Sequence, residues 1–445
     1  MNWLQLISSK RLGQEERHPM RSDDRSEFKR DNDRLIFSAP FRRLQNKTQV
    51  FPLPGSVFVH NRLTHSLEVS SVGMSLGNDV MRQLVVKHPE LRGTLFEECG
   101  TIVSTACLAH DMGNPPFGHS GERAIQAFFL EGAGRYLRDE VSARFWDDIT
   151  HFEGNANAFR LLTHRFKGRR EGGFVLTYST LASIVKYPYS SSLSGKKGKF
   201  GFFHSEEAIF SKIATELGIT SFPQPGGDLR YARYPLVYLV EAADDICYEI
   251  MDIEDAHKLR ILSYDETASL LLSFFPEETR NRMLNRIIEE DIFDPNERVV
   301  YMRASVIGLL VRECVKAFVD HEEAILSGSF EGSLIDHVSA PVLEAYRRCT
   351  KVSRERIYNS KPVLDVELSG YKIIETLMEQ MTRAVVAPDH FYSKQLINRV
   401  SSQYDIMSDQ LETRLMAVID YISGMTDVYA LDIYQKINGI SLPIV

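Results

Sequence analysis

The chain has 445 residues, of which 43% are hydrophobic and 25% charged, proportions that are ordinary for globular proteins. Its formal net charge of −8 argues against a protein that coats nucleic acid, although a local basic pocket remains compatible with that charge. The length allows about two or three average domains, or one large helical unit with an appendage.

The five cysteines favour a reducing compartment. They are odd in number and widely spaced, and none forms a Cys-x-x-Cys pair, so we interpret them as buried thiols and not as a disulfide framework or zinc ribbon. The apolar run 3–7 is too short for a signal peptide, and no stretch of the sequence reaches the length of a membrane span. We therefore expect a soluble, cytoplasmic protein.

The first half of the chain alternates between charged and apolar segments. Residues 9–34 are dense in charges of both signs, which taken alone is typical of a solvated arm. Near-helical spacing of apolar residues predicts a helix over 66–86. The apolar run 101–110 fits a buried strand or a buried helix, and its alanine and leucine content favours the helix. Proline, serine, glycine and lysine over 188–205 predict a mobile basic loop.

Helical periodicity dominates the second half of the chain. It predicts long helices over 235–259 and 303–325, and further helix over 371–386 and 402–437. An extended piece near 362–368 is expected to form a short hairpin. Because there is no internal repeat or long linker, we expect the parts to pack as one body with a mainly α fold.

Four polar residues in apolar or helical surroundings are candidate metal ligands. His65 opens a predicted helix, the adjacent His110 and Asp111 end an apolar run, and Asp244 lies inside an apolar helix. Each motif alone is more often structural, but buried ionised aspartates need a cation or hydrogen-bond donors. Two imidazoles and two carboxylates suit an open six-coordinate shell around Mn²⁺, Fe²⁺ or Ni²⁺. Open positions could hold a water and a phosphate oxygen, as metal-assisted hydrolysis requires.

The helix that carries Asp244 also carries Tyr248 and Asp252 at four-residue spacing, so the three share one face. This stripe fits a lined pocket, in which the tyrosine ring stacks on a sugar and Asp252 accepts a hydroxyl hydrogen bond. An exposed face beside a core face explains the periodicity equally well.

Two further groups of residues fit phosphate chemistry. His119 and Glu122 follow a segment rich in proline and glycine, and a glutamate beside a histidine raises its pKa and makes it a competent general acid. The alternative is a helix cap in which Ser120 is the N-cap. Lys186 precedes the basic loop and Lys199 lies within it, and such point charges suit a phosphate chain.

Taken together, these motifs resemble the deoxyguanosine triphosphate triphosphohydrolase (dGTPase) family of HD-domain metal-dependent phosphohydrolases. The segment GNPPFGHSGE followed by EAADDICY is highly specific for that family, whereas a His-Asp pair alone is not. The matching stretches are Asp24–Asp31, Phe41–Phe51, Arg62–Val69, His110–Glu122, Phe152–Ala156, Glu241–Tyr248 and Gly424–Leu431.

The resemblance implies an all-α fold, with an HD-domain helical core, additional C-terminal helices and at most a short β-hairpin. We expect a charged arm and nucleotide-contacting helix over 1–59, the catalytic core over 60–260 and a packed helical region over 261–445. It also implies hydrolysis of a deoxynucleoside triphosphate, with dGTP preferred, to the deoxynucleoside and tripolyphosphate.

Residue roles carry over from the resemblance position by position. The implied metal ligands are His65, His110, Asp111 and Asp244, which would hold a divalent ion, Mn²⁺ or Mg²⁺. The implied catalytic pair is His119 and Glu122. The implied substrate contacts are Gln49 for the sugar 3′-hydroxyl, Tyr248 and Asp252 for the sugar, and Arg62, Asn155, Lys186, Tyr187 and Lys199 for the phosphates.

The resemblance further implies a homo-oligomer, commonly a hexamer, and allows a regulatory nucleotide or single-stranded DNA as a partner. Two alternative functions stay open. One is an HD-type phosphohydrolase acting on another nucleotide, such as a monophosphate or an alarmone. The other is a regulator that senses dNTPs without turnover.

Overall fold

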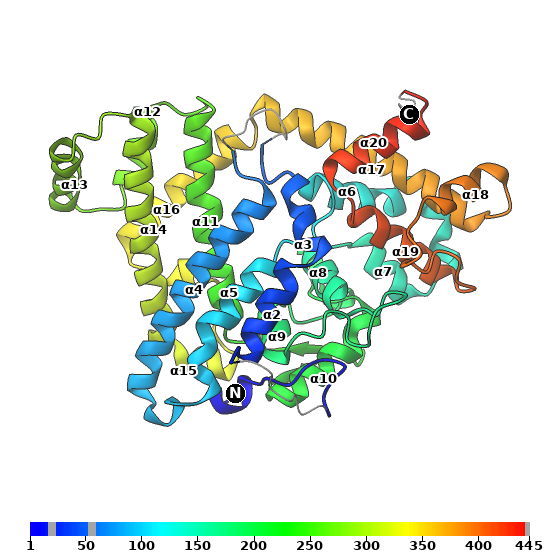
Figure 1. Cartoon of the computed structure of the whole chain (residues 1–445), viewed down its shortest axis with the longest axis horizontal. Coiled ribbons are helices and arrows are strands. Elements are labelled where there is room, and N and C mark those ends of the chain that lie inside the picture. Colours follow the sequence, from blue (N-terminus) through cyan, green and yellow to red (C-terminus); the bar gives the residue numbers. More distant parts are fainter. Residues whose placement is uncertain (17–23, 52–58, 441–445) are drawn as a thin grey trace.

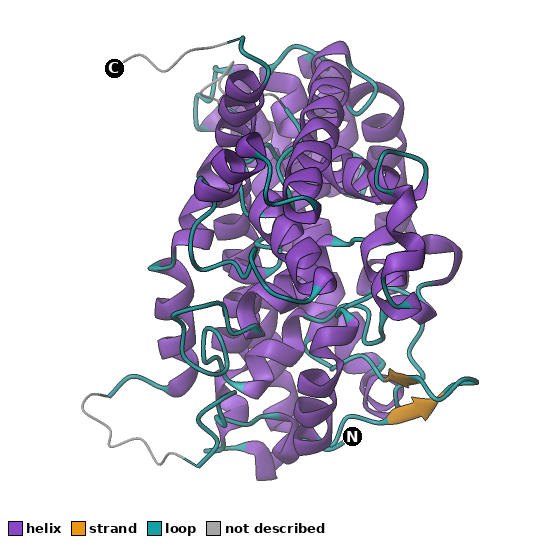
Figure 2. Ribbon diagram, turned by 90° about the vertical axis from the view of Figure 1, so that its right-hand side faces the viewer, coloured by secondary structure: helices purple, strands orange, loops and turns teal. Residues whose placement is uncertain are grey.

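Helices dominate the computed structural model, which describes residues 1–16, 24–51 and 59–440 (Figures 1 and 2). The all-α prediction is confirmed, because the described residues contain only two strands, β1 (Ser221–Pro223) and β2 (Leu229–Tyr231), paired antiparallel. None of the helices in these ranges is both long and apolar enough to cross a bilayer.

The helices fall into four successive groups along the chain. The N-terminal group is α1 (Trp3–Leu6), α2 (Glu27–Ile36) and α3 (Ala39–Arg43). The second is α4 (Arg62–Lys87), α5 (Cys99–Ala109), α6 (Gly118–Leu130), α7 (Ala143–Thr150), α8 (Gly154–Thr163), α9 (Tyr178–Ile184), α10 (Glu207–Leu217) and α11 (Val237–Lys258). The third is α12 (Tyr264–Leu272), α13 (Glu277–Glu289), α14 (Pro295–Asp320), α15 (Glu322–Ser327) and α16 (Ala340–Val352). The last is α17 (Lys361–Val386), α18 (Phe391–Asn398), α19 (Leu411–Ser423) and α20 (Asp427–Ile437).

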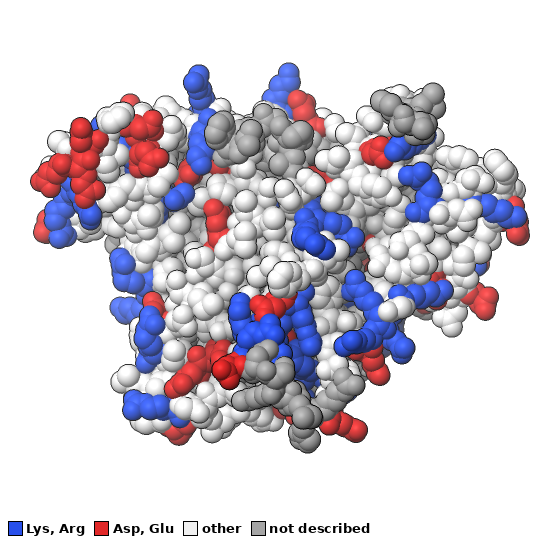
Figure 3. Space-filling view, viewed as in Figure 1, with Lys and Arg blue, Asp and Glu red and all other residues white. Residues whose placement is uncertain are grey.

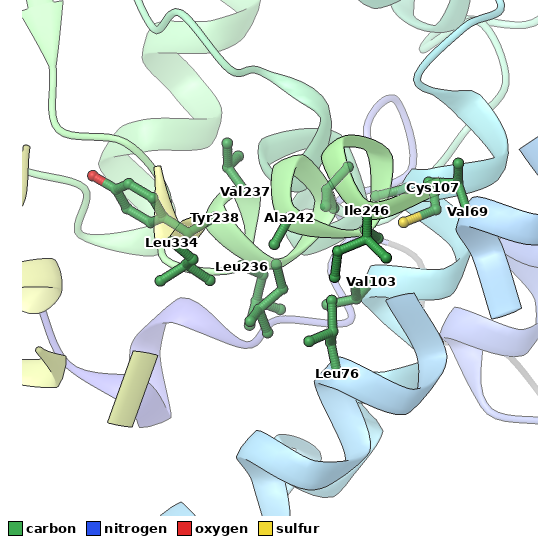
Figure 4. Packing of buried hydrophobic residues seen from close by; sticks show 14 of the residues in the cluster. Val69, Leu76, Val103, Cys107, Leu236, Val237, Tyr238, Ala242, Ile246 and Leu334 are labelled. Carbon is green, nitrogen blue, oxygen red and sulfur yellow. The ribbon is translucent and has the colours of Figure 1, made fainter. Parts of the chain in front are cut away.

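Helices α4, α5 and α11 form the apolar core that supports the candidate site. Val69 of α4, Val103 of α5 and Ile246 of α11 belong to one fully buried cluster (Figure 4). Helices α4 and α5 approach closely because Gly77 faces Gly100: a methyl group on Gly77 would come within 2.8 Å of the Gly100 Cα atom. The apolar run 101–110 is therefore a buried helix, as favoured, and not a strand.

A second core joins α6 and α7 to the C-terminal helices α17 and α19, through buried residues such as Phe128 and Leu377. A buried ion-pair cluster crosses the same boundary. Arg160 of α8 donates to both carboxylate oxygens of Asp420 on α19, at 2.9 and 2.8 Å, and to Glu206 at 2.6 Å. The C-terminal helices are thus fixed to the segment that carries the candidate catalytic residues.

The predicted solvated arm over residues 9–34 is wrong for its described part. Helix α2 buries Phe28 and Asp31 completely. The Asp31 carboxylate accepts hydrogen bonds from the Arg11 guanidinium and from the Thr177 backbone N–H and hydroxyl. Lys and Arg side chains gather on the outer face over α2 and α3 (Figure 3). The charged residues of this segment therefore include a buried pair, Arg11 and Asp31, as well as solvent-exposed side chains.

The hairpin expected near 362–368 is also wrong, because that segment is the start of α17. Pro362 lies in the first turn of α17, where its missing N–H is harmless and its fixed φ suits a helix. The hairpin of the described residues instead joins β1 to β2 through a turn at Gly226 and Gly227, whose φ angles are 97° and 92°. That positive φ explains the glycines.

Candidate active site

Three helices bring the four candidate metal ligands together. His65 lies in the first turn of α4, His110 and Asp111 directly follow α5, and Asp244 lies in the middle of α11. Ligand atoms of His65, His110 and Asp111 lie within 4.8 Å of one another. Oδ1 of Asp244 lies 3.0 Å from Nε2 of His65 and 3.4 Å from Nε2 of His110. The spatial convergence predicted from the sequence is therefore present.

The tautomer of His110 suits a metal ligand. Its Nδ1 lies 2.6 Å from the Cys107 carbonyl oxygen, which can only accept, so Nδ1 carries a proton and Nε2 is the nitrogen left to bind a metal once it has lost its own proton. Within the described part of the chain, this buried Nε2 has no hydrogen-bond partner. A backbone carbonyl that orients an imidazole in this way is a common support of metal-binding histidines.

The local field also favours a cation. Burial raises the pKa of Asp244, but His110 and His65 together lower it by a larger amount, so the pKa lies well below the ordinary value. Burial lowers the pKa of His110, whereas Asp111 and Asp244 raise it, to about 9 overall. The two carboxylates thus favour positive charge between the imidazoles. This nitrogen and oxygen donor set fits a divalent first-row ion.

Arg62 connects the ligand cluster to the adjoining cavity. It is buried, and its Nη1 donates to Oδ2 of Asp111 at 2.8 Å. Its Nη2 lies so close to Gly118 that a methyl group there would come within 2.7 Å, and Gly118 has a φ of 56°. Burial raises the pKa of Asp111, but Arg62 and the nearby histidines bring it below the ordinary value. Asp111 is therefore a carboxylate, as a metal ligand must be.

His119 and Glu122 form the predicted pair at the start of α6. Nδ1 of His119 lies 3.0 Å from Oε2 of Glu122, whose other oxygen accepts the Gly154 N–H at 2.9 Å. The imidazole is 70% exposed and the carboxylate 7% exposed. The capping alternative is wrong, because the N-cap of α6 is Phe117 and the Ser120 hydroxyl donates to a carbonyl of α17.

One cavity of about 530 Å³ collects nearly all the candidate residues. Its lining includes Gln49, Arg62, His110, Asp111, His119, Glu122, Asn155, Lys186, Tyr187, Lys199, Asp244 and Tyr248. Candidate ligands, catalytic residues and phosphate contacts therefore share one space.

His65 and Asp252 lie behind this lining. His65 is 2% exposed and contacts Tyr248 edge to face, with ring centroids 6.5 Å apart. Asp252 is buried, and it accepts a hydrogen bond from the Tyr358 hydroxyl at 2.8 Å. Burial raises the pKa of Asp252 well above its ordinary value. Its predicted contact with a sugar hydroxyl stays a prediction, and its observed link to the cavity runs through Tyr358, which lines it.

The two cavity lysines are each held by a carboxylate. Nζ of Lys186 lies 3.1 Å from Glu241, and Nζ of Lys199 lies 2.6 Å from Glu153. Burial lowers the pKa of Lys199, but Glu153 raises it above the ordinary value, so the amine is charged. Both lysines therefore line the cavity with side-chain nitrogens that are fixed by carboxylates.

Sequence reasoning assigned no role to several cavity residues, among them Glu153, Tyr346 and Tyr358. Glu153 is the N-cap of α8 and also accepts from the Asn155 side chain at 2.8 Å. It lies in Phe152–Ala156, one of the stretches that match the dGTPase family, so the sequence alone could have pointed to it. Tyr358 follows a π-helical turn, a feature that often marks functional sites but leaves no clear sequence pattern.

Comparison with known proteins agrees with this geometry. Residues 62–186 match the HD domain, and residues 337–436 match the phosphohydrolase-associated domain. A deoxyguanosinetriphosphate triphosphohydrolase-like protein of Pseudomonas aeruginosa is 38% identical over 455 residues, covering all of both chains. The chain belongs to the dGTP triphosphohydrolase-like family.

Two further relatives cover most of the chain. The like-named protein of Synechocystis is 36% identical, covering 99% of this chain and all of the relative. The deoxyguanosinetriphosphate triphosphohydrolase of Yersinia enterocolitica is 29% identical, covering 92% of this chain and 93% of the relative. The family membership predicted from the motifs is therefore confirmed.

Proposed function

We propose that this protein hydrolyses deoxynucleoside triphosphates, with dGTP preferred, to the deoxynucleoside and tripolyphosphate. The observation that carries the proposal is the shared cavity in which a His-Asp ligand cluster adjoins the His119–Glu122 pair and two lysines. The names of the relatives support dGTP as the substrate. A site for a nucleoside monophosphate would not need this many cations along a phosphate chain.

The proposed metal ligands are His65, His110, Asp111 and Asp244. A divalent ion such as Mn²⁺ or Mg²⁺ bound there would polarise the α-phosphate and orient a water. The protein contributes the fixed imidazole tautomer of His110 and the ionised state of Asp111, which Arg62 maintains through its 2.8 Å hydrogen bond.

In the proposed reaction, the water oxygen forms a bond to the α-phosphorus, and the bond from that phosphorus to the 5′ oxygen breaks. One proton leaves the water and one reaches the 5′ oxygen. His119 is the proposed acid for the 5′ oxygen or, alternatively, the group that orients the water. Glu122 fixes the imidazole through Nδ1, so Nε2 is the nitrogen that faces the reaction in either role.

The remaining candidate residues bind and orient the proposed substrate. Lys186, Lys199 and Arg62 neutralise the triphosphate, with Tyr187 and Asn155 as further phosphate contacts. Gln49, together with Tyr248 and Asp252, is proposed to hold the sugar. The Tyr248 ring would occupy the space that a 2′-hydroxyl requires, which excludes ribonucleotides by steric contact.

A product assay tests this function. The protein is incubated with each of four dNTPs and four NTPs, with Mn²⁺ or with Mg²⁺, and released nucleoside and tripolyphosphate are measured. We expect deoxynucleoside and tripolyphosphate in equal amounts, dGTP turned over fastest, and no product from NTPs. Binding of dNTPs without product would instead support the sensing regulator, and release of pyrophosphate or phosphate would support another phosphohydrolase.

We also infer that the protein acts in the cytoplasm as a homo-oligomer, with a hexamer as the expected state. A regulatory nucleotide or single-stranded DNA as a further partner stays a prediction. Light scattering of the purified protein, with and without dGTP, tests the assembly.

A further inference from the structure

Asp427, the first residue of α20, holds two distant parts of the cavity wall with one carboxylate. Its Oδ2 accepts the backbone N–H of Thr48 at 2.8 Å, and its Oδ1 accepts the backbone N–H of Phe117 at 3.0 Å. The side chain is 6% exposed. Each oxygen thus serves one donor, and the two donors are far apart in the sequence.

Both donors adjoin residues of the proposed reaction. Thr48 directly precedes Gln49, and Phe117 precedes His119 by two residues. Phe117 has a φ of 61°, a region that residues other than glycine rarely adopt, and α6 begins immediately after it. The direction of α6, and with it the position of His119, depends on this backbone conformation.

Phe117 is held from a second side by α17. A methyl group on Gly370 would come within 2.5 Å of the Phe117 Cβ atom, so the α17 backbone lies directly against this side chain. The unusual φ of Phe117 is therefore fixed by two C-terminal helices together, α17 through packing and α20 through Asp427.

The Thr48 segment is tied to the same C-terminal region. Thr48 pairs with Asn61, next to the start of α4, in an isolated β-bridge. The buried Nζ of Lys47 donates to the carbonyl oxygen of Asn114 and, at 3.0 Å, to that of Ser423. The stretch 423–427 therefore contacts the loops on both sides of the cavity.

We propose that Asp427 is a positioning residue that fixes Gln49 and His119 relative to each other across the cavity. This inference rests on the proposed function, because the proposed function assigns Gln49 to the sugar and His119 to the reacting phosphate. Asp427 is not part of the cavity lining, and among the described residues its carboxylate accepts hydrogen bonds from Thr48 and Phe117 and from none of the proposed metal ligands. It acts through the backbone of the two loops, and so the C-terminal helices take part in aligning the reaction.

Replacement by asparagine and by glutamate separates positioning from packing. Asp427→Asn keeps the size of the side chain but turns one acceptor into an N–H₂ donor, which faces a backbone N–H and loses that hydrogen bond. Asp427→Glu keeps both acceptors but is one methylene too long. Packing alone predicts that Glu is the worse replacement, whereas positioning by two acceptors predicts that Asn is worse.

We expect Asp427→Asn to lower kcat about 10- to 100-fold, because a displacement of about 1 Å can cost about 100-fold. Affinity for Mn²⁺ should stay within about twofold of wild type. Discrimination between a dNTP and its 2′,3′-dideoxy analogue should shrink, because Gln49 is displaced. Asp427→Glu should retain more of the kcat than Asp427→Asn. Exchange of the Thr48 and Phe117 amide protons should be faster in Asp427→Asn than in wild type.

The matched control is Asp432→Asn, which removes the same charge from the same helix. Asp432 is 40% exposed in its ion pair with Lys436 at 2.7 Å, and we expect wild-type kcat and discrimination from this variant. An Asp427→Asn protein with wild-type kcat and wild-type sugar discrimination would overturn the inference. So would an Asp427→Glu protein that is less active than Asp427→Asn.

Two measurements keep this test separate from that of the proposed function. If the wild-type protein turns over no dNTP, the proposed function fails, and amide exchange alone then decides whether Asp427 holds the two loops. If Asp427→Asn does not fold, amide-proton exchange at Thr48 and Phe117 in the wild-type protein decides whether Asp427 holds the two loops. Slow exchange at both Thr48 and Phe117 supports the inference, and fast exchange at either amide contradicts it.

Discussion

Nδ1 of His119 lies 3.0 Å from Oε2 of Glu122, and the pair lines the cavity with a 70% exposed imidazole and a 7% exposed carboxylate. A buried carboxylate thus orients an accessible imidazole, the arrangement expected when the imidazole meets a ligand and the carboxylate does not. A mutation of His119 can therefore separate an effect on catalysis from an effect on stability.

His119→Ala is expected to lower kcat by about 10²- to 10⁴-fold, the usual contribution of a positioned acid or base. Its melting temperature should stay close to wild type, because the imidazole is largely exposed and its loss leaves no cavity in the core. Steady-state kinetics with dGTP and thermal unfolding measure the two effects. His390→Ala, which changes an exposed histidine at the start of α18, is the control. Wild-type turnover in His119→Ala would refute the catalytic role.

Lys199→Gln is expected to raise KM for dGTP about 10-fold or more with a smaller change in kcat, because a charge-assisted contact with phosphate contributes about 1.5–3 kcal/mol. The variant also leaves the buried carboxylate of Glu153 without its cation, so thermal unfolding is measured alongside the kinetics. Lys197→Gln changes an exposed lysine of the same loop and should leave KM unchanged. Equal KM values for the two variants would argue against a phosphate contact by Lys199.

Arg160→Met is expected to destabilise the folded state by about 3–5 kcal/mol, because it leaves two buried carboxylates, Asp420 and Glu206, without their cation. Urea unfolding of wild type and variant gives the free-energy difference. Arg348→Met, at a 52% exposed position on α16, should change stability by less than about 1 kcal/mol. A loss below 1 kcal/mol in Arg160→Met would mean that the cluster does not fasten α19 to α8.

Stability should fall as the pH rises through the neutral and alkaline range, in part because of His60. Burial lowers the pKa of His60, but hydrogen bonds to Asp255 and Glu68 raise it from 6.5 to about 10. The folded state therefore binds this proton more tightly than the unfolded state does. The stabilisation is complete below about pH 6.5 and is lost towards about pH 10. Urea unfolding across that window should show a flatter profile for His60→Gln than for wild type, and parallel profiles would contradict the assignment.

The sequence allowed most of the fold to be predicted, because apolar residues recur at helical spacing wherever a helix buries one face. Prediction failed where local signals have two meanings. The sequence predicts an extended segment near 362–368, yet Pro362 lies in the first turn of α17, a position that suits proline equally well. The charges of α2 suggested solvent, yet Asp31 is buried against Arg11, a partner that periodicity cannot identify.

The candidate site was predictable where the chemistry of a residue is distinctive. It was less predictable where the question is whether a side chain lines the cavity or lies buried behind the lining. His110 and Asp244 stood out because polar groups interrupt apolar helices. The stripe of Tyr248 and Asp252 did not reveal that the tyrosine lines the cavity while the aspartate lies behind it. Glu153 and Asp427 act by holding other groups, and their roles depend on contacts between segments far apart in the sequence.

The central claim is that His65, His110, Asp111 and Asp244 bind the divalent ion that dNTP hydrolysis requires. Its most direct test is titration of Mn²⁺ into metal-free wild type and Asp244→Ala, with bound ion and released tripolyphosphate followed in the same samples. Asp79→Ala, which changes an aspartate near the other end of α4, is the control. We predict that wild type and the control bind the ion and regain turnover as it binds, and that Asp244→Ala loses both. Full turnover by Asp244→Ala would contradict the account.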